Sequence, residues 1–158
     1  MIKTLEPIRR EVVVPVGKQR AFEVFTADMT RWWPSTHHIG TADIEEVLVE
    51  PREGGRWYTR HVDGSETSTG YVSAWSPPDH LAMTWQIGAD WRYHPDLVTM
   101  VEVSFVAVSE SSTLVKLEHR DLEAFGPDAE RMRDRFSQPG AWAGILAAFA
   151  GSLEATRR

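Results

Sequence analysis

The sequence predicts an α+β domain in which an antiparallel sheet of about six to seven strands is covered by one long C-terminal α-helix. Three observations support this class. Apolar residues recur at helical spacing near the two ends of the chain, whereas residues 43–122 hold only strand-like runs with β-branched, aromatic and alternating side chains. The last helical segment carries the only long apolar stripe, and an apolar sheet face needs such a cover.

The N-terminal part of the sequence predicts one strand and two short helices. Residues 8–14, IRREVVV, are rich in β-branched side chains and stop at a proline, which is typical of a strand. Within residues 22–29, apolar side chains recur at i, i+3 and i+7, which indicates a short amphipathic helix. A second helical turn through Trp32 and Trp33 ends at Pro34, because proline cannot continue a helix.

The middle of the chain predicts an antiparallel meander that ends in a long hairpin. Asp63-Gly64 and Pro77-Pro78-Asp79 are turn sequences, and the polar run SESS forms the tip of the hairpin. The expected strands lie at 43–50, 54–62, 66–75, 80–87, 97–108 and 113–122.

Two helices are expected in the C-terminal part. Apolar side chains of residues 127–136 share one helical face. After the start signals Ser137 and Pro139, a longer helix runs to terminal arginines that favour the negative pole of its dipole. Its apolar stripe consists of Trp142, Ile145, Leu146, Phe149 and Leu153. No repeat or flexible linker divides the chain, so residues 1–158 are expected to form a single domain.

Composition limits the partners and the compartment. The 158 residues, 42% hydrophobic and 25% charged, are typical of a globular domain with its own core. A net charge of -6 disfavours nucleic acid, and no apolar run is long enough for membrane insertion. The lack of cysteine excludes disulfides and thiolate chemistry and fits the cytoplasm. We expect a cytoplasmic monomer or homodimer without metal or cofactor, because no phosphate-loop, dinucleotide or metal motif occurs.

Six stretches, which together cover nearly the whole chain, carry a likeness to a known superfamily. They are RAFEVFTADMTRWWP, VEPREGGRWYTR, DGSETSTGYVSAWSPPDHLAMTWQI, VEVSFVAV, KLEHRDLE and GAWAGILAAFAGSL. In this order they resemble the START-like (SRPBCC, helix-grip) superfamily, and in particular the branch named after the activator of Hsp90 ATPase. The resemblance implies a helix-grip fold, in which a curved antiparallel sheet wraps around the long C-terminal helix. It also implies a cavity between them for a small hydrophobic or amphipathic molecule.

Alternation within the strands indicates which side chains face the helix. In residues 80–87 the apolar set includes Met83 and Trp85, and Val103 and His119 lie on the same face of the next two strands.

In the strand around Thr59, one face carries two aromatic rings and a hydroxyl, and the other carries Arg60. An arginine is the costlier residue to bury, so we expect Trp57, Thr59 and His61 to face inward.

These assignments give a predicted ligand site, although the same residues also fit a tightly packed core. A small-molecule site is usually an apolar pocket with a few convergent polar groups. In a packed core, the buried histidines would simply be hydrogen-bonded to neighbours. The predicted site residues are Trp32, Trp57, Thr59, His61, Met83, Trp85, Val103, His119, Trp142 and Leu146.

Two aromatic stretches are harder to place. Trp32 and Trp33 point about 100° apart on a helical turn, so both cannot face the same spot. The resemblance implies that one of the two indoles forms a lid or wall at one end of the cavity; in the alternative, both only anchor a short helix. His37 and His38 are expected to be a solvent-exposed pair in a loop, since adjacent residues splay apart and a zinc site needs three or four convergent ligands. The loop 88–96, GADWRYHPD, is either a well-packed corner or a mobile rim of the pocket.

Three functions fit the sequence. The first is binding of a small hydrophobic or amphipathic ligand without turnover. The second, suggested by superfamily relatives, is an enzyme of the cyclase/aromatase type that uses inward His61 or His119 with an acid such as Glu118 or Asp121. The third is an Hsp90 co-chaperone-like protein, for which the chain offers one domain and no additional chaperone-binding domain.

Overall fold

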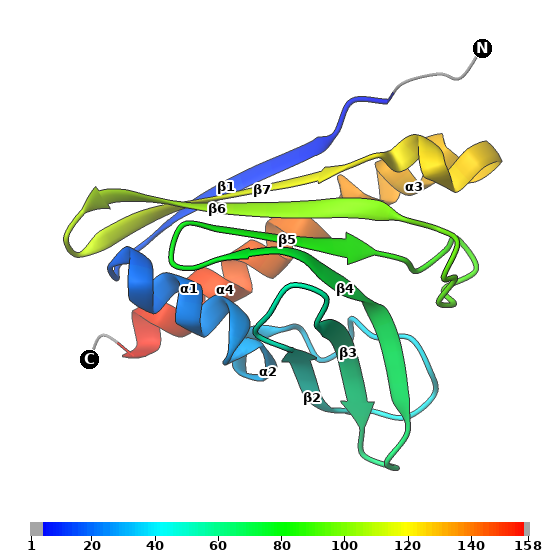
Figure 1. The fold of residues 1–158 in the computed structure, drawn as a ribbon, viewed down its shortest axis with the longest axis horizontal. Coiled ribbons are helices and arrows are strands. Elements are labelled where there is room, and N and C mark those ends of the chain that lie inside the picture. The colour runs from blue at the N-terminus through cyan, green and yellow to red at the C-terminus, as the bar shows by residue number, and fades with distance from the viewer. Residues whose placement is uncertain (1–4, 157–158) are drawn as a thin grey trace.

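The computed structural model describes residues 5–156 and contains one antiparallel sheet of seven strands, with two short helices between the first and second strands and further helices after the last strand (Figure 1). The strand order is β1-β7-β6-β5-β4-β3-β2, so β2 to β7 form a meander and β1 pairs with the last strand. The predicted helix-grip α+β fold is confirmed. The elements are β1 (Ile8–Val14), α1 (Lys18–Thr26), α2 (Met29–Trp32), β2 (Ile44–Val49), β3 (Arg56–His61), β4 (Glu66–Ser76), β5 (His80–Trp85), β6 (Thr99–Ser109), β7 (Ser112–Arg120), the 3-10 segment η1 (Leu122–Asp128), α3 (Ala129–Phe136) and α4 (Trp142–Thr156).

Helix α4 covers the curled sheet. Figure 1 shows it crossing the sheet, with α1 and α2 near its C-terminal half. Phe149 of α4 contacts Phe25 and Trp32, and the ring centroids are 5.1 Å apart in both pairs. The apolar stripe from Trp142 to Leu153 is buried along its whole length, as its spacing predicts.

Strand β4 bends near Gly70 and belongs to both halves of the sheet. Before the bend it pairs with β3, and after it with β5. A register shift opposite Trp57 and Tyr58 marks the bend as a β-bulge. A β-carbon at Gly70 would overlap the carbonyl oxygen of Thr84, so this close approach of two strands requires glycine. In Figure 1, β2 and β3 consequently turn away from the plane of the other strands.

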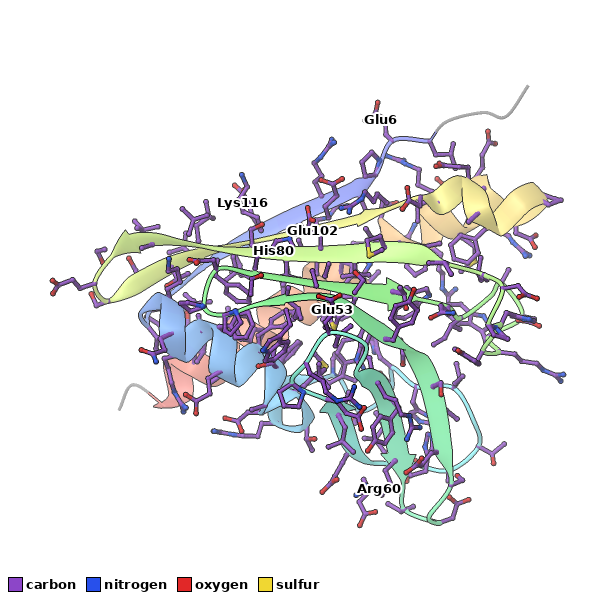
Figure 2. The ribbon with its side chains drawn as sticks, viewed as in Figure 1. Glu6, Glu53, Arg60, His80, Glu102 and Lys116 are labelled. Atoms are coloured by element: carbon purple, nitrogen blue, oxygen red, sulfur yellow. The ribbon has the colours of Figure 1, made fainter. Side chains whose placement is uncertain are left out.

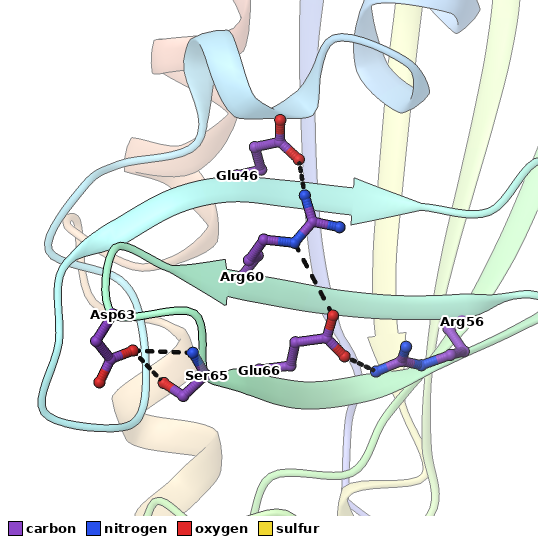
Figure 3. A network of polar contacts seen from close by, with 6 residues as sticks. All are labelled: Glu46, Arg56, Arg60, Asp63, Ser65 and Glu66. Atoms are coloured by element: carbon purple, nitrogen blue, oxygen red, sulfur yellow. Dashed lines mark hydrogen bonds and ion pairs between the residues drawn. The ribbon is translucent and has the colours of Figure 1, made fainter.

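The two faces of β3 are assigned as predicted. Its buried side chains are Trp57, Thr59 and His61. Arg60 lies on the other face, where its guanidinium bridges Glu46 at 2.7 Å and Glu66 at 3.9 Å, and Glu66 also pairs with Arg56 (Figure 3). The predicted choice between the two faces of this strand is therefore confirmed.

The face of β5 opposite to Met83 and Trp85 is buried as well. The hydroxyl of Thr84 donates to Oε1 of Gln86 at 2.7 Å, and the amide of Gln86 donates to the carbonyl of Pro95 at 3.2 Å. The segment after β5 thus folds back over the end of this strand and supplies partners for its polar side chains.

Ion pairs mark the outer face of the sheet. His80 and Glu102, on neighbouring strands, are 3.0 Å apart, and Arg120 is 3.3 Å from the same carboxylate. Figure 2 shows His80 and Glu102 side by side on this face. Half-exposed pairs of this kind add little to stability. Among residues 5–156, no helix has the length and the apolar character needed to cross a membrane.

Candidate functional site

A cavity of about 550 Å³ lies at the N-terminal end of α4, between this helix, strands β2 to β4 and the end of β5. Its volume falls within the range of roughly 300–1,000 Å³ that is usual for small-molecule sites. The bend of β4 contributes to this space, because it carries β3 and the first half of β4 away from the helix.

Five of the seven tryptophans of the chain line this cavity. Four of them form a closed ring of edge-to-face contacts. The ring centroids are 6.0 Å apart for Trp33 and Trp57, and 5.9 Å apart for Trp57 and Trp85. They are 5.8 Å apart for Trp85 and Trp142, and 6.3 Å apart for Trp142 and Trp33. Each such pair is worth roughly 0.5–1.5 kcal/mol beyond its buried area, so this is a rigid aromatic wall.

The tryptophan pair at the end of α2 divides between core and cavity. Trp32 is only 4% exposed, and its indole N–H donates to the carbonyl of Val24 at 2.9 Å. Trp33 lines the cavity, and its N–H donates to the carbonyl of His37 at 2.7 Å. Trp32, predicted as a site residue, therefore lies in the core, because the helix ends between the two residues and turns Trp33 toward the cavity.

Three threonines on β3 and β4 form one polar part of the wall. Thr59 and Thr67 are cross-strand partners, and Thr69 follows on the same strand as Thr67. His61 lies behind them, with Nδ1 2.8 Å from the carbonyl oxygen of Ala42 and Nε2 2.8 Å from Oγ1 of Thr67. A carbonyl can only accept, so in the neutral ring Nδ1 donates to Ala42 and Nε2 accepts from the threonine hydroxyl. Thr67 therefore presents oxygen lone pairs to the cavity, and His61 acts only as its support.

His119 supports the aromatic wall from behind and does not line the cavity. The indole N–H of Trp142 donates to Nδ1 of His119 at 3.0 Å, and Nε2 of His119 donates to Oγ1 of Thr99 at 2.8 Å. The hydroxyl of Thr99 in turn donates to the carbonyl of Trp85 at 2.8 Å. This chain of donors requires a neutral imidazole with its proton on Nε2. Burial lowers the pKa of His119 from 6.5 to about 3, which keeps the ring neutral.

Both histidines are therefore engaged by structural hydrogen bonds. The acids named in the enzyme hypothesis are not their partners: Glu118 lies 3.6 Å from Arg9, and Asp121 is exposed. His61 and His119, predicted as site residues, stand one layer behind the cavity surface.

Three other predicted site residues belong to the packed core. Met83, Val103 and Leu146 are 1%, 0% and 2% exposed and are not part of the cavity wall. Met83 and Val103 lie on β5 and β6, and Leu146 follows Ile145, the last residue of α4 that lines the cavity. Strand alternation identifies which side chains face the helix, but it does not identify where along the helix the helix and the sheet separate to leave a cavity. The predicted residues that do meet at the cavity are Trp57, Thr59, Trp85 and Trp142.

The entrance to the cavity is formed by two loops and the end of α3. His37 and His38 are half-buried there, which corrects the expectation of a solvent-exposed pair. Trp91 is 43% exposed, and the guanidinium carbon of Arg135 lies 5.2 Å from the centre of its ring. Through Trp91, the loop 88–96 therefore contributes to the rim of the cavity.

Several residues of the wall are not among the predicted site residues. Thr67 and Thr69 alternate on one strand, and this spacing was a usable signal for a polar inner face. Trp91 was indicated only as part of a loop that could form a rim, and Arg135 had no local signal, because a loop and a helix far apart in sequence bring the two side chains together.

The lining suits an organic molecule better than an ion. Of the described residues that line the cavity, Arg135 alone carries a full charge, and no carboxylate is among them. Within residues 5–156, no three His, Asp or Glu side chains gather closely enough to hold a metal ion.

Comparison with known proteins places the chain in a family. Over residues 16–151 it matches the family described as activator of Hsp90 ATPase homolog 1-like protein. The chain belongs to this family. The resemblance recognised in the sequence is thereby confirmed: the chain that contains this cavity is a member of the family and has a START-like fold.

Solved structures of similar chains support this assignment. This chain is 34% identical to an anthrahydroquino-gamma-pyrone synthase, Txn09, solved in complex with SUM. The match covers 94% of this chain and 97% of the synthase chain, with a TM-score of 0.66. This chain is 26% identical to CalC, a self-sacrificing resistance protein from Micromonospora echinospora, with 95% of each chain covered and a TM-score of 0.72. The Aha1 dimer from Colwellia psychrerythraea, 12% identical with a TM-score of 0.61 over 95% of this chain and 97% of that one, shares the fold. None of the curated proteins compared with the chain matches it.

Proposed function

We propose that this protein binds a small aromatic molecule, hydrophobic or amphipathic, in the cavity at the start of α4 and does not transform it. The observation that carries the proposal is the placement of five of the seven tryptophans around one cavity of about 550 Å³. A wall of fixed indoles favours flat aromatic ligands, which pack against them edge-to-face or offset.

The polar groups of the cavity indicate an amphipathic ligand. The threonine hydroxyls of β3 and β4 lie on one wall, and Arg135 stands at the entrance. The apolar body of a ligand would pack on the indoles, while its oxygen substituents would meet the hydroxyls. Such a division between an apolar wall and a few placed polar groups is usual for specific small-molecule sites.

One similar structure favours the same ligand class. The 34% identical protein is named as a synthase of an anthrahydroquino-gamma-pyrone, a fused-ring compound. A fused aromatic ring system suits the indole wall of this chain.

Binding without turnover is favoured by the state of the two buried histidines. His61 and His119 both have their ring nitrogens engaged, and His119 would lose its bond from Trp142 on accepting a proton. Neither is therefore free to act as a general base.

A second candidate function is turnover with His38 as the base. Its Nδ1 is 3.2 Å from the carbonyl oxygen of Ile39, which makes Nε2 the basic nitrogen of the neutral ring. His38 lines the cavity. The candidate is also supported by the 34% identical protein, which is named as a synthase.

Native mass spectrometry of the freshly purified protein tests the proposal. We expect a retained aromatic compound, or uptake of added aromatic compounds, with each released unchanged when the protein is unfolded. Release of a chemically altered compound that stops in His38→Gln would favour turnover. Failure to take up any member of a panel of two- to four-ring aromatic compounds would contradict both candidates. A pull-down from lysate separates ligand binding from the chaperone role for which the family is named.

A further inference from the structure

The indole N–H of Trp85 has no hydrogen-bond partner. It is the one buried side-chain nitrogen or oxygen atom in this condition among the described residues. Trp85 is 8% exposed and forms part of the cavity wall. Buried polar groups are nearly always paired, so an unpaired donor at a binding cavity calls for an explanation.

None of the aromatic rings that contact Trp85 offers its N–H a free acceptor. Its ring contacts those of Trp57, Phe136, Trp142 and His119. Of these neighbours, only the histidine has an acceptor nitrogen, and it is already occupied by the indole N–H of Trp142. The indoles of Trp33 and Trp142 differ from that of Trp85, because their N–H groups donate to protein atoms.

We propose that Trp85 determines specificity: its N–H donates to an oxygen acceptor, a carbonyl or a phenolic oxygen, on the buried end of an aromatic ligand. The inference rests on the proposed binding function and adds the polarity of the ligand. An unpaired donor disfavours a pure hydrocarbon, which leaves the N–H unsatisfied, and favours a ligand of the same shape that carries an oxygen.

The test compares two planar tricyclic probes of nearly the same shape. Fluorenone carries a carbonyl oxygen where fluorene has a methylene group. Dissociation constants for both are measured by quenching of tryptophan fluorescence in wild type, Trp85→Phe and Trp33→Phe. Trp33→Phe is the matched control, because it removes an indole from the same wall whose N–H donates to the protein.

We expect the preference for fluorenone over fluorene to fall about tenfold in Trp85→Phe, the effect of one lost hydrogen bond of about 1.4 kcal/mol. The preference should be unchanged in Trp33→Phe. In ¹H–¹⁵N spectra of the wild type, the indole N–H signal of Trp85 should move downfield with fluorenone and not with fluorene. This spectrum decides the question even if Trp85→Phe does not fold.

Each contrary outcome has a distinct meaning. One contrary outcome is that both probes bind the wild type, that the preference for fluorenone is the same in Trp85→Phe, and that the Trp85 signal responds equally to both probes. In that case the role of Trp85 is overturned and the binding function stands. If neither probe binds the wild type, the proposed function fails and this inference fails with it.

Discussion

Acidification should destabilise the protein through His119. The side chain is buried and neutral, with a pKa lowered from 6.5 to about 3 by burial. The unfolded chain therefore takes up a proton on this ring as the pH falls below 6.5, and the folded chain does not do so until about pH 3. Because the unfolded state binds more protons in this window, the free energy of unfolding decreases as the pH is lowered.

The size of the effect follows from the two pKa values. A gap from 6.5 to about 3, at about 1.4 kcal/mol for each pH unit, amounts to about 5 kcal/mol at the acid end of the window. Between pH 7 and pH 5 the expected loss is about 2 kcal/mol. This narrower range lies above the ordinary pKa values of carboxylic acids, so their titration contributes less.

Urea denaturation at pH 7, 6 and 5 measures this loss in wild type and in His119→Gln. Glutamine cannot be protonated in this range but keeps one donor and one acceptor for Thr99 and Trp142. We expect the wild type to lose about 2 kcal/mol more than the variant between pH 7 and pH 5. If the two proteins lose the same amount, His119 titrates alike in both states, and the neutral network that argues against a general base does not exist.

Three further changes test the packing by urea denaturation. Leu146→Ala should cost about 2–5 kcal/mol, because Leu146 is 2% exposed where α4 meets the sheet; a smaller loss would mean that this contact is loose. Gly70→Ala should cost about 3 kcal/mol or more of the free energy of unfolding, since the new β-carbon would overlap the carbonyl of Thr84. Near-normal stability of this variant would show that β4 does not approach β5 as described. Met83→Trp should cost roughly 1–3 kcal/mol through overpacking and leave probe binding intact; loss of binding in a stable variant would place Met83 at the cavity.

Much of the fold could be predicted because its signals are local. The β-branched run of residues 8–14 and the apolar stripe that begins at Trp142 match β1 and α4 in the structure. The face of β3 could be chosen because burying Arg60 would be costly, and the structure places this residue outside with two carboxylates. The periodicity of apolar residues and the cost of burying a charged residue depend on residues that are close in sequence, so both can be read from the sequence.

The site was less predictable because a cavity is a property of distances between elements. Met83 and Trp85 share one face of β5, yet only Trp85 reaches the cavity. The helix geometry of Trp32 and Trp33 required that they diverge, but it did not say which one the core would take. Trp91 meets the end of α3 only through the tertiary fold. None of these distances can be read from the pattern of a single strand or helix.

Blocking the cavity tests the account most directly. Ala141 lines the cavity beside the first turn of α4, whereas Ala147 lies on the exposed side of the same helix. The measurement is a fluorescence titration with the apolar probe N-phenyl-1-naphthylamine of wild type, Ala141→Trp and the matched control Ala147→Trp, with denaturation midpoints to verify folding. We predict saturable binding to wild type and to Ala147→Trp, and its loss in a folded Ala141→Trp. Undiminished binding to Ala141→Trp, or no binding to the wild type, would contradict the claim that this cavity is the ligand site.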